Sequence, residues 1–258
     1  MNGPLFSIIT CTYNAEKTLL RTLQSVASQT FSDYEHLIID GASKDGTLLL
    51  LDGNNPRTVV WSERDKGLYD AMNKGILRAR GHYVIFLNAG DKFHSADTLA
   101  QVATHIYNII GETETAGESR LPVVVYGETD LVDDSGRFLR HRRLQAPDVL
   151  TWRSFIDGML VCHQSFYVRR DIALAEPYDL TYRFSADFDW CIRCLRHASV
   201  SQILNTRLIL TDYLAEGMTT SNHKASLIER FRIMSHHYGL LRTVMQHAWF
   251  CVRAVLKK

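Results

Sequence analysis

The sequence predicts an α/β protein with a mostly parallel β-sheet and helices on both of its faces. Between residues 6 and 87, short apolar runs typical of buried strands alternate with segments in which apolar residues recur at helical spacing. Polar residues follow these strands where they end, and the ends of parallel strands share one edge of a sheet. The composition agrees, because 46% apolar and 22% charged residues permit a large core and argue against extensive disorder.

The expected elements follow in chain order. In the first part we expect strands at 6–12, 34–40, 58–62 and 84–87, with helices at 15–29, from 47 onward, and at 68–79, the last stopped by Gly81. In the second part we expect helices at 96–110 and 187–198, strands at 123–126, 163–168 and 203–212, a hairpin turn at 133–137, polar loops at 111–120 and 213–222, and a helical segment at 223–258. Asp187 is a suitable N-cap for the helix that it begins.

Charge and cysteine content exclude several classes of protein. The net charge of +1 argues against a nucleic-acid binder with a broad basic surface. Five cysteines, an odd number set mostly in apolar stretches, are typical of reduced core thiols in a cytosolic protein, and Cys191 and Cys194 lack the second ligand pair of a zinc site. No secretory leader and no apolar run of about 18 residues is found. We therefore expect a cytoplasmic protein without a membrane span.

A set of polar residues lies at or just beyond the predicted strand ends: Thr12, Tyr13, Asn14, Asp40, Asp65, Asn88 and Asp91. Each alone is explained by a turn or a helix cap, where Asp and Asn are common for local reasons. Together they converge on the crevice in which parallel sheets bind ligands. The basic run at 140–143 is either a solvated face or an attraction for a phosphate-bearing ligand.

Four segments in order resemble glycosyltransferase family 2, the inverting nucleotide-sugar enzymes with the GT-A fold. They are SIITCTYN (7–14), HLIIDGASKDGT (36–47), GLYDAMNKGI with GHYVIFLNAGD (67–91) and SADFDW (185–190). The segments CHQS (162–165), SADFDW and GMTTSN (217–222) look most like bacterial transferases that assemble exopolysaccharide repeats of the colanic-acid type. The resemblance implies a GT-A domain over 1–222, with a donor half (1–91) and an acceptor half (92–222), followed by a helical extension (223–258).

The resemblance also assigns donor-binding residues. Thr12, Tyr13 and Asn14 would line the nucleoside pocket, and Asp40 would accept a hydrogen bond from the imide N–H of the base, which implies a UDP-sugar. Residues nearer the ribose and phosphates would be Asp65, Lys66, Asn73 and Asn88.

Asp91 matches the last carboxylate of the family's DxD-type motif, which holds a divalent metal against the diphosphate. Mg²⁺ or Mn²⁺ is the expected ion, because both prefer oxygen ligands. The family often has Asp where this chain has Asn88 and Gly90, so only Asp91 keeps a charge. We therefore expect weak metal binding without nucleotide.

Asp187 matches the catalytic base of the family, which takes the proton of the acceptor hydroxyl during a single in-line displacement. Asp189, two residues on, is the alternative base. The acceptor would lie near His163, Gln164, Asp189 and Trp190, although His163 and Gln164 equally fit a buried hydrogen-bonded pair.

The predicted function is transfer of a sugar from a nucleotide sugar to a hydroxyl of a glycan or lipid-linked acceptor, in the synthesis of a bacterial surface polysaccharide. One alternative is a nucleotidyltransferase, which the absence of a Gly-rich phosphate loop after the first strand disfavours. The other is a catalytically weak scaffold that binds nucleotide sugars.

The last segment, 240–258, has an apolar helical face with aromatic residues and basic flanks. Its apolar residues are Leu241, Val244, Met245, Ala248, Val252 and Val255, widened by Trp249 and Phe250. Three arrangements fit this pattern: peripheral contact with the inner face of the cytoplasmic membrane, packing on the catalytic domain, and a homodimer interface.

Overall fold

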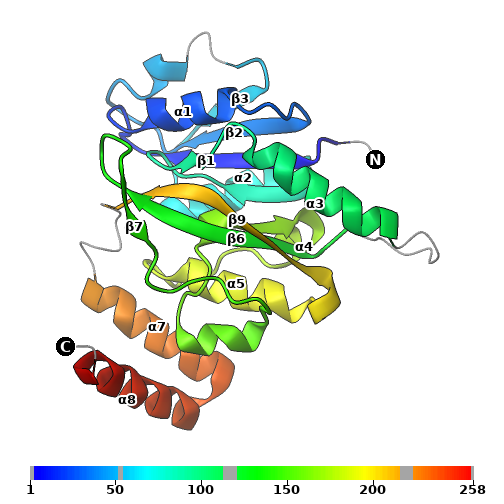
Figure 1. The fold of residues 1–258 in the computed structure, drawn as a ribbon. Helices are drawn as coiled ribbons and strands as arrows, with labels where there is room; N and C mark the ends of the chain where they lie inside the picture. Colours follow the sequence, from blue (N-terminus) through cyan, green and yellow to red (C-terminus); the bar gives the residue numbers. More distant parts are fainter. Residues whose placement is uncertain (1–2, 52–54, 113–120, 216–222, 257–258) are drawn as a thin grey trace.

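The computed structural model describes residues 3–51, 55–112, 121–215 and 223–256 (Figure 1). Its nine-stranded sheet has the order β3-β2-β1-β4-β8-β6-β9-β5, with β7 paired to β6. The strands are β1 (Phe6–Thr12), β2 (Tyr34–Asp40), β3 (Thr58–Ser62), β4 (Tyr83–Phe86), β5 (Lys92–Phe93), β6 (Val124–Val132), β7 (Phe138–His141), β8 (Phe166–Arg169) and β9 (Ile203–Leu214). The α-helices are α1 (Leu19–Ala27), α2 (Leu68–Arg78), α3 (Thr98–Glu112), α4 (Arg170–Ala175), α5 (Ala186–Arg196), α7 (His223–Tyr238) and α8 (Leu240–Leu256). Short 3₁₀ helices are η1 (Leu48–Leu51), η2 (Trp152–Asp157), η3 (His163–Ser165) and η4 (Val200–Gln202).

The strand directions confirm a mostly parallel sheet. Strand β1 pairs in parallel with β2 and β4, and β2 pairs in parallel with β3. Strand β8 is antiparallel to both β4 and β6, so β6 and its parallel partner β9 run in the direction of β1. The carboxyl ends of β1, β2 and β4 therefore lie at one edge, as expected.

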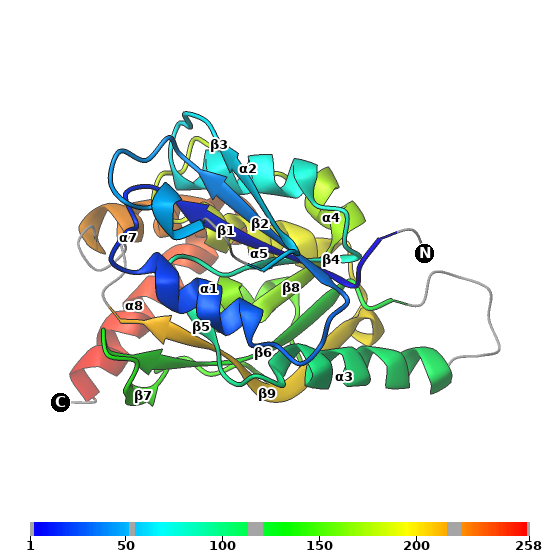
Figure 2. The same cartoon turned by 90° about the horizontal axis from the view of Figure 1, so that it is seen from above.

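Helices cover both faces of the sheet, with α1 and α3 on one side and α2 and α4 on the other (Figure 2). Alternation along β1 decides which residue faces which layer. Phe6 and Ile8 belong to the core cluster that contains α3, whereas Ile9 and Cys11 pack in the cluster of α2 and α5. Burial on both faces explains why the β1 and β4 sequences are almost continuously apolar.

Several boundaries differ from the sequence expectation. Helix α1 begins at Leu19 rather than at 15, because the N–H groups of Ala15 and Glu16 donate to the side chains of Thr47 and Asp45. The segment from 47 forms only the 3₁₀ turn η1, and strand β6 extends to Val132. The 163–168 segment begins as η3 before it becomes β8.

Gly81 does not stop helix α2, which already ends at Arg78. It allows a close approach of two backbones, because a Cβ at this position would lie 2.6 Å from the backbone nitrogen of Ser7. The N-cap of α5 is Ser185, and Asp187 lies in the first turn of that helix. Most of the first predicted polar loop (113–120) and the GMTTSN segment lie outside the described residues.

The helical end of the chain consists of two helices separated at Gly239, whose φ of 87° favours glycine. Helix α7 packs against α5 and η2, and α8 packs against α7 (Figure 1). Within the described ranges, no helix combines the length and apolarity needed to cross a bilayer.

Candidate active site

The carboxylate of Asp40 joins the ends of three strands. It accepts hydrogen bonds from Thr12 Oγ1 at 3.0 Å, from Ser62 Oγ at 2.6 Å, and from both the backbone N–H and the hydroxyl of Ser43. Burial alone would raise the pKa of Asp40, but these donors outweigh it and hold the pKa below its ordinary value. Asp40 is fully buried, and its carboxylate connects the ends of β1, β2 and β3. Its predicted role as acceptor of the imide N–H of a base stays a prediction.

Tyr13 and Asp65 lie beside Gly41, the residue that follows Asp40. Gly41 separates them, since a Cβ at this position would be 2.5 Å from Asp65 Oδ2 and 3.3 Å from the ring of Tyr13. The ring of Tyr13 is 64% exposed, and Asp65 Oδ1 accepts the N–H of Gly67 at 2.8 Å. An exposed ring beside a carboxylate is suited to stacking a nucleobase and accepting its N–H.

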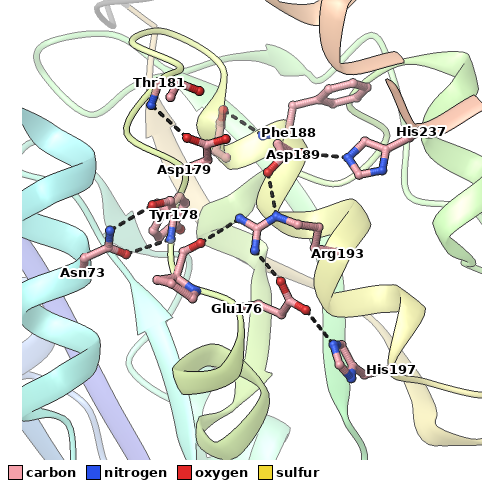
Figure 3. A network of polar contacts seen from close by, with 12 residues as sticks. Asn73, Glu176, Tyr178, Asp179, Thr181, Phe188, Asp189, Arg193, His197 and His237 are labelled. Atoms are coloured by element: carbon pink, nitrogen blue, oxygen red, sulfur yellow. Dashed lines mark hydrogen bonds and ion pairs between the residues drawn. The ribbon is translucent and has the colours of Figure 1, made fainter. Parts of the chain in front are cut away.

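Three other predicted donor residues have different surroundings. Asn14 connects the end of β1 to the next turn, because its N–H donates to Ser43 Oγ and its Oδ1 accepts from Lys44 N. Lys66 is exposed just before α2, and its N–H donates to Asp70 Oδ2 at 2.9 Å. The side-chain amide of Asn73 pairs with both the N–H and the C=O of Tyr178 and so anchors the 176–178 loop (Figure 3). Its predicted position near the ribose stays a prediction.

The turn from Asn88 to Asp91 lies directly after β4. The hydroxyl of Thr22 holds it, donating to the carbonyls of Asn88 and Asp91 and accepting the N–H of Gly90. Asp91 is buried, with Oδ2 accepting from Gln164 Nε2 at 2.9 Å and Oδ1 from Leu214 N at 3.0 Å. Burial raises the pKa of Asp91 to about 7, although the hydrogen bonds from Leu214 and Gln164 and the charge of Arg21 oppose this rise.

This turn fits a hard divalent cation. The amide oxygen Oδ1 of Asn88 is buried and has no hydrogen-bond partner among the described residues. Together with a buried carboxylate whose charge is incompletely compensated, it offers the oxygen donors that Mg²⁺ and Mn²⁺ accept. Asn88 and Asp91 are therefore the residues able to hold the metal.

A second group of candidate ligands is formed by His94, Asp130 and Asp212, whose ligand atoms lie within 4.8 Å of one another. Lys92 Nζ lies 2.8 Å from Asp212 Oδ2, and His141 pairs with Asp130 at 2.7 Å. Because Lys92 and His141 already pair with these carboxylates, we assign no cofactor to this group.

Asp187 lies in the first turn of α5 and keeps 19% of its side chain exposed. The Tyr69 hydroxyl donates to Oδ1 at 3.2 Å, and Oδ2 is 3.6 Å from His163 Nδ1. Burial lowers the pKa of His163, and the nearby Asp187 opposes that shift. A neutral His163 beside a partly exposed carboxylate leaves Asp187 free to take a proton.

The 3₁₀ helix η3 connects the two carboxylates. His163 faces Asp187, and the next residue, Gln164, donates to Asp91. The Gln164 carbonyl accepts from Thr211 of β9, and Ser165 bonds to Thr129 of β6. Strands β6 and β9 thus fix the position of η3. Asp91 and Asp187 lie on the two sides of η3, next to Gln164 and His163.

Asp189 and Trp190 are not positioned to contact an acceptor. Asp189 is buried and binds His237 Nε2 at 2.7 Å and Arg193 Nε at 2.6 Å, and Arg193 continues to Glu176 (Figure 3). Trp190 is fully buried and stacks on Tyr178 with ring centroids 4.8 Å apart. Asp187 and Asp189 are two positions apart on the helix, a rotation of about 200°, so the two carboxylates point away from each other.

Three residues near the site are not among the site residues predicted from the sequence, although one of them, Arg142, lies in the basic run noted there. Tyr69 follows Leu68 in the GLYDAMN segment and reaches Asp187. Arg142, a member of the 140–143 basic run, is half-buried against the carbonyls of Met159 and Leu160. Burial raises the pKa of Tyr213, and the charges of Asp91 and Asp187 raise it further. Only the basic run gave a sequence signal.

Comparisons with known proteins show the family and the fold of the chain. The family model "Glycosyl transferase family 2" matches residues 7–112. A PGL/p-HBAD biosynthesis glycosyltransferase of Mycobacterium bovis is 36% identical over 205 residues, which cover 78% of this chain and 73% of that protein. The amylovoran biosynthesis glycosyltransferase AmsB of Erwinia amylovora is 28% identical over 73% of this chain and 63% of AmsB.

Among solved structures, S. aureus TarS in complex with UDP-GlcNAc has a similar fold. The TM-score is 0.67 at 19% identity, over 89% of this chain and 64% of the TarS chain. At this identity the likeness concerns the fold alone.

Proposed function

This chain belongs to glycosyltransferase family 2, and from that premise we propose that it transfers a sugar, with inversion, from a UDP-sugar to a hydroxyl of a glycan or lipid-linked acceptor. Residues 1–91 would bind the donor and 92–222 the acceptor. The observation that carries the proposal is the placement of Asp91 and Asp187 on the two sides of His163 and Gln164.

The donor would lie along the carboxyl ends of β1 and β2. Tyr13 stacks on the base, Asp65 accepts its N–H, and Thr12 and Asp40 keep the strand ends at a fixed spacing. Lys66 is free to approach the phosphates. The choice of uridine draws on TarS, which was solved with UDP-GlcNAc.

Asp91 and Asn88 would hold the divalent metal, whose chemistry is to neutralise the charge of the diphosphate. Arg142, half-buried near His163, adds a protein cation to the same region. Gln164 orients Asp91 through the bond to Oδ2.

Asp187 would act as general base. Its carboxylate takes the proton of the acceptor hydroxyl while the hydroxyl oxygen forms a bond to the anomeric carbon. The bond from that carbon to the diphosphate oxygen breaks on the opposite face, and its electron pair leaves with the nucleoside diphosphate. Tyr69 and His163 hold Asp187 in the required orientation.

The acceptor class is supported by the relatives, which are named for the biosynthesis of PGL/p-HBAD and of amylovoran. A mass-spectrometric panel of nucleotide sugars tests the proposal. We expect one UDP-sugar to release UDP in the presence of Mn²⁺ or Mg²⁺, and Asp187→Asn to abolish transfer to an added acceptor. Release of inorganic pyrophosphate in place of a nucleoside diphosphate would contradict it.

A further inference from the structure

Helices α7 and α8 present an unusual apolar surface at the end of the molecule away from β3 (Figure 1). Leu241, Met245 and Trp249 are 76%, 63% and 52% exposed. Five more apolar side chains of the two helices are also exposed: Leu227, Ile228, Leu240, Val244 and Val252. We call these eight residues the tail face.

The opposite side of α8 is the one that packs on the protein. Thr243 is buried, Phe250 packs against the main core, and Gln246 donates to Asp157 Oδ1 at 2.8 Å. His247 contacts Phe231 of α7, with ring centroids 5.0 Å apart. A helix at the surface of a globular protein normally turns its apolar side inward. Here the polar side is docked and the apolar side faces outward, so packing on the catalytic domain does not explain the pattern.

The charge of this segment favours one kind of partner. Residues 223–258 contain seven Lys or Arg and one acidic residue, a net charge of +6, whereas residues 1–222 have a net charge of −5. The acidic residue, Glu229, is occupied by the N–H groups of Arg183 and Phe184. Lys224, Arg232 and Arg242 are exposed. Two copies joined by this surface would bring like charges together, but an anionic lipid surface would attract it.

We propose that the tail face binds the surface of an anionic lipid bilayer. The apolar side chains enter the boundary between headgroups and acyl chains, and the basic side chains lie among the headgroups. This inference goes beyond the proposed reaction, and binding can be measured without turnover.

The position of the tail face would bring a bound bilayer close to Asp187. Ser226, next to Leu227 and Ile228, bonds through its hydroxyl to Ser185, the N-cap of α5, at 2.9 Å. The bilayer would therefore lie beside the helix end that carries Asp187. Provided that the proposed function holds, a lipid-linked acceptor anchored in that bilayer would be close to the base.

Co-sedimentation of the full-length protein with vesicles tests the proposal. We expect binding to phosphatidylcholine vesicles that contain phosphatidylglycerol, and release in high salt. The triple variant Leu241→Ser, Met245→Ser, Trp249→Ser should lose more than tenfold in partitioning. Replacing Lys224, Arg232 and Arg242 by Gln should cost about fivefold for each residue, equivalent to about 1 kcal/mol.

The matched control is Leu77→Ser, Leu139→Ser, Val200→Ser, three apolar side chains that are 70%, 51% and 55% exposed elsewhere. It should bind vesicles like the wild type. Thermal melting checks each fold, and Leu241→Ser alone replaces the triple variant if that variant melts early. Equal binding by control and tail variants, or no binding by the wild type, would overturn the proposal. A dimer that the tail variant dissociates, without vesicle binding, would assign the face to a second copy.

Discussion

Asp40 and Asp91 lie at neighbouring parts of the same sheet edge, but they differ in how many hydrogen bonds their carboxylates accept. Asp40 accepts four hydrogen bonds, and its pKa is below the ordinary value. Asp91 has two donors to its side chain, and burial raises its pKa to about 7. The first carboxylate is a satisfied structural element, whereas the second is a charge that lacks compensation.

The same contrast separates Asp189 from Asp187. Asp189 pairs with the charged guanidinium of Arg193 and with His237. Asp187 accepts hydrogen bonds from the Tyr69 hydroxyl and the Phe188 N–H and lies 3.6 Å from Nδ1 of a neutral His163, so no cationic side chain among the described residues contacts it. Incomplete compensation costs stability, and folds retain it where a ligand or a proton completes the site. The comparison therefore separates the carboxylates that build the site from those that we propose to act in it.

The largest effect should come from Asp187→Asn. An amide cannot take the acceptor proton, so we expect turnover to fall by about 10²–10⁴-fold. Nucleotide affinity, measured by calorimetry, should stay within about twofold, because the proposed partner of Asp187 is the acceptor and not the donor. Turnover near that of the wild type would show that Asp187 is not the general base.

Asp91→Ala should lower metal-dependent activity by about 10²-fold, since it deletes the only carboxylate of the LNAGD segment. EDTA should silence the native enzyme, and excess Mn²⁺ should restore it. Asp134→Ala, an exposed acidic residue of the hairpin, is the matched control and should behave like the wild type. Full activity in EDTA would instead mean that protein cations such as Arg142 replace the metal.

Asp189→Asn should lower the stability of the protein and leave turnover nearly unchanged, whereas Asp187→Asn should lower turnover. It breaks a buried ion pair with Arg193 and a bond to His237, so we expect a loss of about 3 kcal/mol in the free energy of unfolding. Turnover per folded molecule should change little. Denaturant unfolding and active-site titration distinguish the two quantities. A variant of full stability without turnover would show that the roles of the two residues are exchanged.

The buried polar residues of the first half predict a pH dependence of stability. His36 donates through Nε2 to the Thr10 hydroxyl, which itself donates to the Leu87 carbonyl. Burial lowers the pKa of His36 from 6.5 to about 3. Because the folded pKa is depressed, the unfolded chain binds the proton first, and stability falls as pH decreases through 6.5.

Between pH 7 and pH 5 this histidine should cost the fold about 2 kcal/mol. Denaturant unfolding at the two pH values measures the loss. His36→Gln should be less stable at pH 7 but should lack most of this pH dependence. An equal pH dependence in the variant would assign the effect to other groups.

The smallest effect should follow Tyr13→Ala. Its ring is 64% exposed, so the free energy of unfolding should not change measurably. Loss of one stacking partner should weaken UDP binding by about tenfold. Tyr107→Ala on α3, 47% exposed and distant from the strand ends in sequence, is the control. Unchanged UDP affinity would move the base away from Tyr13.

Local sequence patterns located most of the fold. The runs 6–12, 34–40 and 58–62 match β1, β2 and β3 residue for residue. Strands β1 and β2 are buried along their whole length, and such strands carry the apolar runs that predicted them. Strand β3 is an edge strand with no fully buried residue, so the same explanation does not apply to it. The convergence of Thr12, Asp40 and Asp91 on one edge also follows from the alternation of strands and helices. Family resemblance then identified Asp187 among the acidic residues of the second half.

Tertiary structure alone decided what each side chain does. SADFDW contains two similar carboxylates. Contacts with His237 of α7 and Arg193 of α5 enclose Asp189, whereas Asp187 stays partly exposed, and the local sequence does not record this difference. Asn73 pairs with Tyr178 across 105 residues, and Gln164 reaches Asp91 across 73. The apolar pattern of 240–258 predicts a helix but not which side of it packs on the protein. That side is decided by partners such as Phe231 and Asp157. Such contacts join residues distant in the chain, whereas helical and strand periodicity record only the neighbours of each residue.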